Sequence, residues 1–113
     1  MNQREFCEAL ASADPQLVAL WTSHVQSNDG ELFTYVYVDG VLGWTLEPAN
    51  ANSPSLDRVA GVLEAGLSDP DEQVQTLTVV GFLEQTPNDA PILRHLGPLA
   101  TGWFREFRPT VRM

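Results

Sequence analysis

Few side chains in this 113-residue chain are of the types that carry out catalysis or bind metal ions. The only histidines are His24 and His95, and the only cysteine is Cys7. A metal site needs several ligands at set spacings, and no H-x-x-x-H or C-x-x-C pair occurs. No serine lies in a nucleophile-elbow pattern, and no glycine-rich loop is present to hold a phosphate. We therefore expect no enzyme activity, no metal site and no cofactor.

The one cluster of side chains that could bind a ligand or transfer a proton consists of carboxylates. Asp69, Asp71 and Glu72 are close together in the sequence and could bind a cation or transfer a proton. A helix that begins at Asp69-Pro70 explains them as capping groups, because Glu72 would complete a capping box with Asp69. Glu84 ends a nearly all-apolar run, so it is either paired and partly buried or at a recognition surface. All four acids are candidate contacts for a partner.

Charge is distributed unevenly along the chain, whose formal net charge is −9 at pH 7. Residues 1–89 hold two arginines and fourteen acids, a net −12, whereas residues 90–113 hold four arginines and one acid, a net +3. Such an acidic body repels nucleic acid and anionic membranes and attracts basic partners. Acidity also keeps a small protein soluble, so composition alone leaves both explanations open. We expect a protein partner with a basic surface, and neither nucleic acid nor membrane.

Aromatic side chains in the stretch 32–46 are a second set of candidate contacts. Tyr35 and Tyr37 would share one side of a strand, and Trp44 is either a core residue or an exposed anchor, since Trp and Tyr are frequent in binding hot spots. Alternating aromatic and β-branched residues up to Asp39-Gly40 favour a β-hairpin with an Asp-Gly turn. The competing interpretation is an extended segment that enters a helix near this turn sequence.

Helical periodicity and capping signals account for most of the remaining chain. They predict a single, mainly α-helical domain over residues 1–113, a compact bundle that contains one solenoid-like helical hairpin at 53–85. The expected helices run from Asn2 to about Ala11, from Asp14-Pro15 to a polar loop at 26–31, from Ser53-Pro54 to about Gly66, from Asp69-Pro70 to about Gln85, from Asp89 to Gly97-Pro98, and from about Leu99 to just before Pro109.

The expected core follows from the apolar positions of these helices. The centre of the helix after Asp69 is apolar almost all round, which predicts burial on most of its surface. Cys7 is expected to be a small buried hydrophobe. The expected inward-facing residues are Phe6, Leu10, Leu17, Val18, Trp21, Val25, Val74, Leu77, Val80, Leu83, Leu99, Trp103, Phe104 and Phe107.

The N-terminal sequence MNQREFCEAL lacks a basic region followed by an apolar run, as a signal peptide would have. No segment approaches 18 continuous apolar residues. We therefore expect a soluble, cytoplasmic protein.

The order of the segments FTYVYVDGVLGWTLE, LDRVAGVLEAGL, DEQVQTLTVVGFLEQ and LRHLGP resembles a family of small, acidic bacterial domains associated with immunity proteins of polymorphic or contact-dependent toxin systems. The resemblance spans about residues 5–105, and its most specific parts are Val74–Glu84 and Leu96–Pro98. It implies a mainly helical fold, which favours the helix over the hairpin at 39–46. It implies a protein that binds a cognate toxin and covers its active site. Toxin-facing residues differ between such proteins, so no binding residue is carried over.

A non-catalytic interaction or regulatory module, which binds another protein through a helical groove, is the alternative function. The two differ in whether a toxin is encoded next to this protein and is inhibited by it.

Overall fold

Asparagine and aspartate side chains begin the first two helices, as their positions in the sequence predict. In the computed structural model, which describes residues 1–27 and 33–107, Asn2 Oδ1 accepts a hydrogen bond from the Glu5 N–H at 2.8 Å and Glu5 Oε1 accepts one from the Asn2 N–H at 2.9 Å. This reciprocal pair is the predicted capping box. Asp14 Oδ1 accepts a hydrogen bond from the Gln16 N–H at 2.8 Å, and Pro15 is the first residue of the second helix.

The described part of the chain is mainly helical and contains no β-strand. The Cα radius of gyration is 13.3 Å, which matches the roughly 13 Å of a compact folded domain of about 100 residues. The elements, in chain order, are α1 (Gln3–Ala11), α2 (Pro15–Ser27), α3 (Thr34–Leu46), the 3₁₀ turn η1 (Pro48–Asn50), α4 (Ser55–Ser68), α5 (Glu72–Thr76), the π-helical segment η2 (Leu77–Phe82), the 3₁₀ turns η3 (Leu83–Gln85) and η4 (Pro91–His95), and α6 (Pro98–Glu106).

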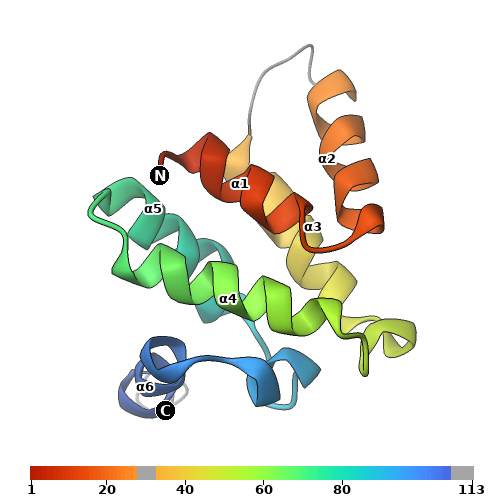
Figure 1. Ribbon diagram of the computed structural model, residues 1–113. Coiled ribbons are helices and arrows are strands. Elements are labelled where there is room, and N and C mark those ends of the chain that lie inside the picture. The colour runs from red at the N-terminus through yellow and green to blue at the C-terminus, as the bar shows by residue number, and fades with distance from the viewer. Residues whose placement is uncertain (28–32, 108–113) are drawn as a thin grey trace.

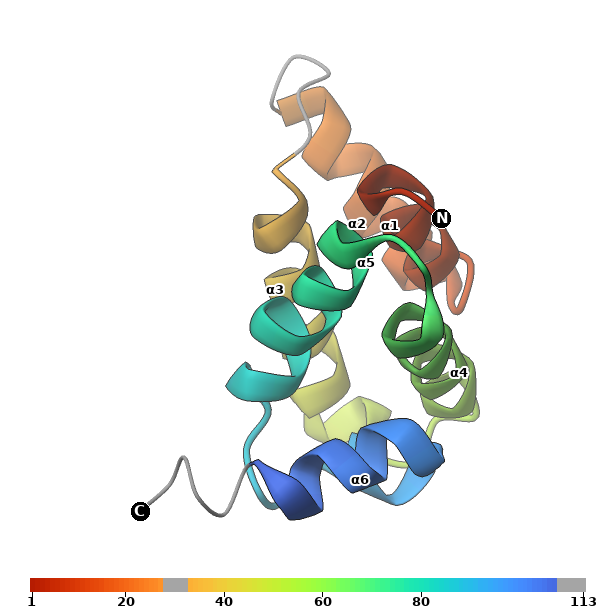
Figure 2. The same cartoon turned by 90° about the vertical axis from the view of Figure 1, so that its left-hand side faces the viewer.

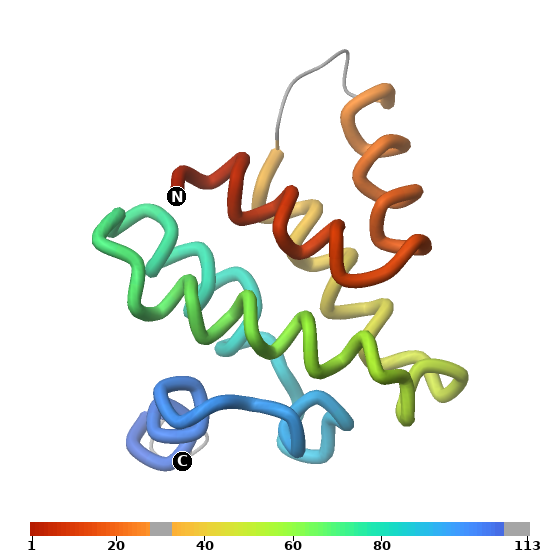
Figure 3. Tube along the Cα trace, viewed as in Figure 1, coloured from red at the N-terminus to blue at the C-terminus, as the bar shows by residue number. Residues whose placement is uncertain are grey.

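Helices α1, α3 and α4 and the continuous segment α5–η2 form the centre of the molecule (Figure 1). α1 contacts α3 and α4, and η2 contacts the same two helices, so α1 and α4 form one layer and α3 with α5–η2 the other (Figure 2). α2 packs against α1 and α3 at one end of the molecule, and η4 with α6 packs against α4 at the other. The tube in Figure 3 shows that the chain turns back after α4, so that α5 and η2 run alongside it.

The stretch at 34–46 is helical, so the β-hairpin is not confirmed. Helix α3 begins at Thr34, well before the Asp-Gly sequence at which the helical alternative placed its start, and residue 32 lies outside the described part. Its buried residues recur in pairs, Tyr37 with Val38, then Val41 with Leu42, and again at 44–45, which is the spacing of a helix. Packing of this buried face overrides the local β-propensity of the aromatic and β-branched residues.

The helix after α4 differs from its predicted form in three ways. Its N-cap is Asp71, whose Oδ1 accepts a hydrogen bond from the Gln73 N–H at 2.8 Å, and not Asp69. It changes from α to π geometry at Leu77, and the wider turn leaves Val80 41% exposed, although Val80 was expected to be buried. The solenoid-like helical hairpin is not confirmed, because its second helix is not a continuous α-helix: α5 ends at Thr76 and is followed by π-helical and 3₁₀ segments.

Two glycines allow the layers to approach closely. A Cβ at Gly66 would clash with the Thr78 hydroxyl and lie 2.7 Å from Phe6 Cε1, so α4 meets η2 and α1 at a point where only a hydrogen fits. A Cβ at Gly81 would lie 3.3 Å from Tyr35 Cδ1 and 3.4 Å from Val38 Cγ1. The ring of Tyr35 therefore rests against the backbone of η2.

Three apolar residues of α2 and α6 that were predicted to lie in the core are exposed. Val18 on α2 and Leu99 and Phe107 at α6 are each about half exposed, although all three were expected to face inward. At α6 the cause is Glu64 of α4, which accepts hydrogen bonds from the Leu99 N–H at 2.7 Å and the Ala100 N–H at 3.1 Å. This contact turns the small Ala100 towards α4 and leaves Leu99 outside. The loop expected at 26–31 and the end of the last expected helix lie partly outside the described residues.

Candidate partner-binding surface

The structure places the seven predicted contact residues in three different environments. Tyr37 and Trp44 belong to the core, and Asp69 and Asp71 hold the turn between α4 and α5. The other three, Tyr35, Glu72 and Glu84, are exposed.

Tyr37 and Trp44 are core residues. Tyr37 is 2% exposed, and its hydroxyl donates a hydrogen bond to the Leu17 carbonyl at 3.0 Å. Trp44 is 8% exposed, and its Nε1–H donates to Gln16 Oε1 at 2.6 Å. Both side chains are buried with their polar atoms paired inside the chain, so the structure does not support either as a partner contact.

Asp69 and Asp71 hold the turn that joins α4 to α5. Asp69 is nearly buried, with Oδ2 2.8 Å from the Met1 amino group and Oδ1 accepting a hydrogen bond from the Asp71 N–H at 2.9 Å. The hydrogen bond from the ammonium group, with that from the Asp71 N–H, lowers the pKa of Asp69. Since Asp71 caps α5, both carboxylates have structural roles.

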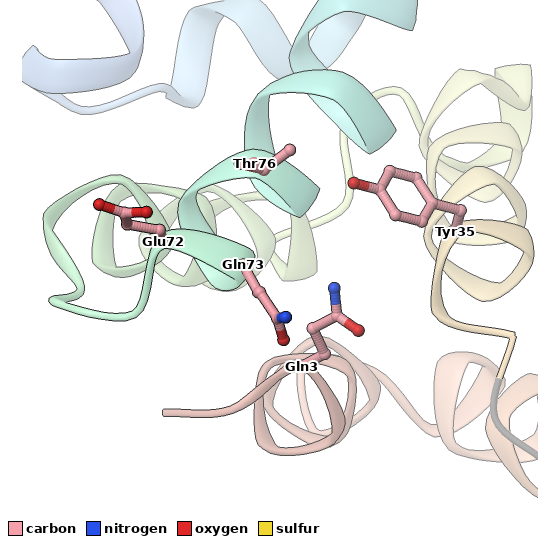
Figure 4. Close-up of a pocket in the computed structure, with 5 residues that line it drawn as sticks. All are labelled: Gln3, Tyr35, Glu72, Gln73 and Thr76. Carbon is pink, nitrogen blue, oxygen red and sulfur yellow. The ribbon is translucent and has the colours of Figure 1, made fainter.

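Tyr35 and Glu72 come together at a depression of about 300 Å³, which we call the Tyr35 depression. Glu84 is also exposed, on η3, at the opposite end of η2 from α5. Figure 4 shows that the side chains of Gln3, Tyr35 and Gln73 point towards a common space, whereas the Glu72 carboxylate lies at the rim and points away. The lining residues are Gln3 from α1, Tyr35 from α3, and Glu72, Gln73 and Thr76 from α5.

The polar atoms of the Tyr35 depression are largely unused. Gln3 Oε1 accepts one hydrogen bond, from the Thr34 hydroxyl at 3.3 Å. Within residues 1–27 and 33–107, the side chains of Tyr35, Gln73 and Thr76 make no hydrogen bond to other residues, and Glu72 forms no ion pair. Neutral Gln3, Gln73 and Thr76 carry no sequence signal of a site, because their role arises only where three separate elements meet.

Apolar side chains lie on the side of the first turn of α3 that faces away from the Tyr35 depression. Val36 is 63% exposed and lines a second depression, of about 310 Å³, between α2 and α3. Leu20 of α2 lies on the opposite wall, where a Cβ at Gly40 would be 3.2 Å from Leu20 Cδ2. Adjacent residues of α3, Tyr35 and Val36, thus face a polar and an apolar depression.

Both arginines of the acidic part of the chain interact within the chain. Arg4 Nε lies 3.4 Å from Glu8 Oε2 along α1. Arg58 donates from Nε to the Ala13 carbonyl at 2.8 Å and from a terminal nitrogen to the Ser55 hydroxyl at 2.8 Å. Neither arginine lines the Tyr35 depression, so the negative field of this face is not offset there.

Across the described ranges, no group of three or more His, Cys, Asp or Glu side chains is arranged to hold a metal ion. None of the helices in the described part of the chain is long and apolar enough to cross a membrane. Comparison of this chain with protein families, with curated proteins and with solved structures finds no match.

Proposed function

We propose that this protein is an immunity-type inhibitor, which binds a cognate bacterial toxin domain in the cytoplasm and covers its active site without catalysing a reaction. The observation that carries the proposal is the Tyr35 depression, where an exposed aromatic ring and unused polar groups lie in an acidic face. The resemblance of residues 5–105 to immunity-type domains supports the same function.

The exposed residues of this face suit recognition of a basic protein. Tyr35 is 41% exposed and supplies a rigid aromatic surface with a hydroxyl, the combination found at many binding hot spots. Val80 is exposed on η2 beside Gly81, against which the Tyr35 ring lies, and would exclude water around such a contact. Glu72 and the net charge of −12 over residues 1–89 would speed association with a cationic toxin.

The direct test is to mix the protein with the product of the adjacent gene and to measure both binding and toxin activity. An inhibitor of this kind should bind with one defined stoichiometry and a nanomolar dissociation constant, and it should abolish the toxin's activity when equimolar. Binding should weaken as salt rises, because part of the attraction is between exposed charges. Failure of the adjacent gene product to bind would overturn the proposal.

An interaction or regulatory module is the second candidate, and the apolar depression between α2 and α3 favours it. Leu20 and Val36 form opposite walls of that depression, which would take an apolar side chain of a partner helix. A module of this kind would bind its partner without inhibiting it. Tight binding that leaves the activity of the partner unchanged would therefore favour this second function.

A further inference from the structure

We infer that the Tyr35 depression is a receptor for an arginine side chain. The inference rests on the proposed function in one respect, since the arginine would come from the toxin. Its physical basis is local and does not depend on the identity of that toxin.

The lining groups match the hydrogen-bonding needs of a guanidinium group. A guanidinium carries five N–H donors and no acceptor, so it needs several oxygen atoms around it. Tyr35, Gln73 and Thr76 each carry a side-chain oxygen that can accept, and Figure 4 shows the side chains of Tyr35 and Gln73 directed at the same space. Gln3 lines this space with its amide group, whose oxygen already accepts a hydrogen bond from the Thr34 hydroxyl. Since most of these oxygens have no partner within the described residues, they are available without the loss of an internal bond.

The charge of the surroundings selects a cation. Among residues 1–27 and 33–107, Glu72 at the rim is the only charged residue that lines the depression, and the two arginines of residues 1–89 are bound elsewhere. An anionic group would be repelled by the rim and by the acidic body, whereas a neutral amide would gain nothing from either.

The ring of Tyr35 favours arginine over lysine. Because the ring rests against Gly81, its position is held by the backbone of η2. A planar guanidinium can stack on such a ring while its edge donates hydrogen bonds, which an ammonium group cannot do.

The test uses the whole protein and three small probes: N-acetyl-arginine amide, its neutral isostere N-acetyl-citrulline amide, and N-acetyl-lysine amide. Nitrogen-15 NMR spectra report on the side-chain amides of Gln3 and Gln73 during each titration. The arginine probe should shift both amides in a saturable way, with the lysine probe weaker and the citrulline probe weakest. Shifts that are absent, or equal for arginine and citrulline, would overturn the inference.

Variants locate the site. Tyr35→Leu removes the ring and the hydroxyl and should weaken arginine binding by about tenfold. Glu72→Gln removes one rim charge and should weaken it by about two- to fivefold, the range of an exposed ion pair. Glu47→Gln is the matched control, since Glu47 is an exposed acid at the other end of α3. Circular dichroism checks that each variant is folded, and equal binding by all three variants would contradict this site.

The outcomes separate this inference from the proposed function. If the arginine probe binds but the adjacent gene product does not, the receptor stands and the inhibitor proposal falls. If the gene product binds and is inhibited but no arginine probe occupies the depression, the inhibitor proposal stands and this inference falls.

Discussion

The face formed by α1, α3 and α5 and the end formed by α4 and α6 use carboxylates of α4 and α5 differently. At the α4–α6 end the two carboxylates of α4 that contact other elements bind within the chain: Glu64 accepts hydrogen bonds in the first turn of α6, and Asp57 Oδ1 lies 2.6 Å from His95 Nδ1. The exposed residues of the α4–α6 end include the apolar Leu99. On the other face, Glu72 and its polar neighbours have few internal partners.

This comparison shows that an acidic residue is a contact candidate only when the fold does not already use it. Asp69, Asp71 and Glu72 are nearly consecutive, yet the first two hold a turn and only Glu72 remains at an open surface.

The largest expected effect is at the inner side of η2. Leu77 is fully buried, so Leu77→Ala should lower the free energy of unfolding by about 2–5 kcal/mol through lost burial and a cavity. Val80→Ala, three residues further on, is the matched control and should cost about 0.5 kcal/mol or less. Urea unfolding followed by circular dichroism measures both values. Equal losses would mean that η2 does not separate core from surface as described.

The next effect separates the two carboxylate roles. Glu64→Ala removes the acceptor of two N–H groups at the start of α6 and should destabilise the protein by about 1–2 kcal/mol. Glu72→Ala should cost only about 0.3–1 kcal/mol, from the lost interaction of a charge with the first turn of α5. The same unfolding experiment compares them. A larger loss for Glu72 than for Glu64 would reverse the assignment of the two roles.

Thiol reactivity provides a probe of opening in the α1 region. Burial raises the pKa of Cys7 to about 12, so at pH 8 the native thiol is both inaccessible and protonated. Iodoacetamide should therefore label the protein only through unfolding or local opening, and labelling should be faster in Leu77→Ala. Mass spectrometry follows the added group. Rapid labelling of the native wild-type protein, at the rate of a free thiol, would show that the helices packed against α1 do not cover Cys7.

The smallest expected effect is the acid dependence of stability. The folded protein lowers the pKa of Asp69, so its contribution is present above the unfolded pKa of about 4 and is lost as pH falls through the folded value. Asp69→Asn should therefore flatten the decline of stability below about pH 4. Unfolding curves at a series of pH values measure this slope, and an unchanged slope would mean that Asp69 is not paired in solution.

Capping signals predicted the starts of the first two helices correctly, because side-chain caps act over a few residues. Asn2 and Asp14 are examples. The sequence could not decide the conformation of α3, because its exposed positions include the apolar Val36 and Leu46 and so do not form the polar face that marks a helical period. The sequence also could not predict the π-helical segment, in which Val80 is exposed. Nor could it predict the hydrogen bonds from the first turn of α6 to Glu64, which leave Leu99 exposed. These features depend on contacts between segments distant in sequence.

Only the exposed residues of the candidate site that have distinctive chemistry could be predicted from the sequence. Tyr35 and Glu72 stand out by residue type, but Tyr37 has the same type as Tyr35 and is buried. The difference arises from the rotation of α3 against α2 and η2, which no local pattern encodes. Gln3 joins the site because α1 packs against α3 and α5.

The most direct test of the central claim, that the α1–α3–α5 face is the binding surface, is the rate of association with the adjacent gene product. Wild type, Glu72→Lys and Glu106→Lys should be compared at low and high salt by stopped-flow fluorescence. Glu106 is an exposed acid of α6, so its reversal changes the net charge equally but at the other end of the molecule. The account predicts that Glu72→Lys slows association more than Glu106→Lys does, and that it weakens the dependence of the rate on salt. Equal effects of the two reversals, or a larger effect of Glu106→Lys, would contradict it.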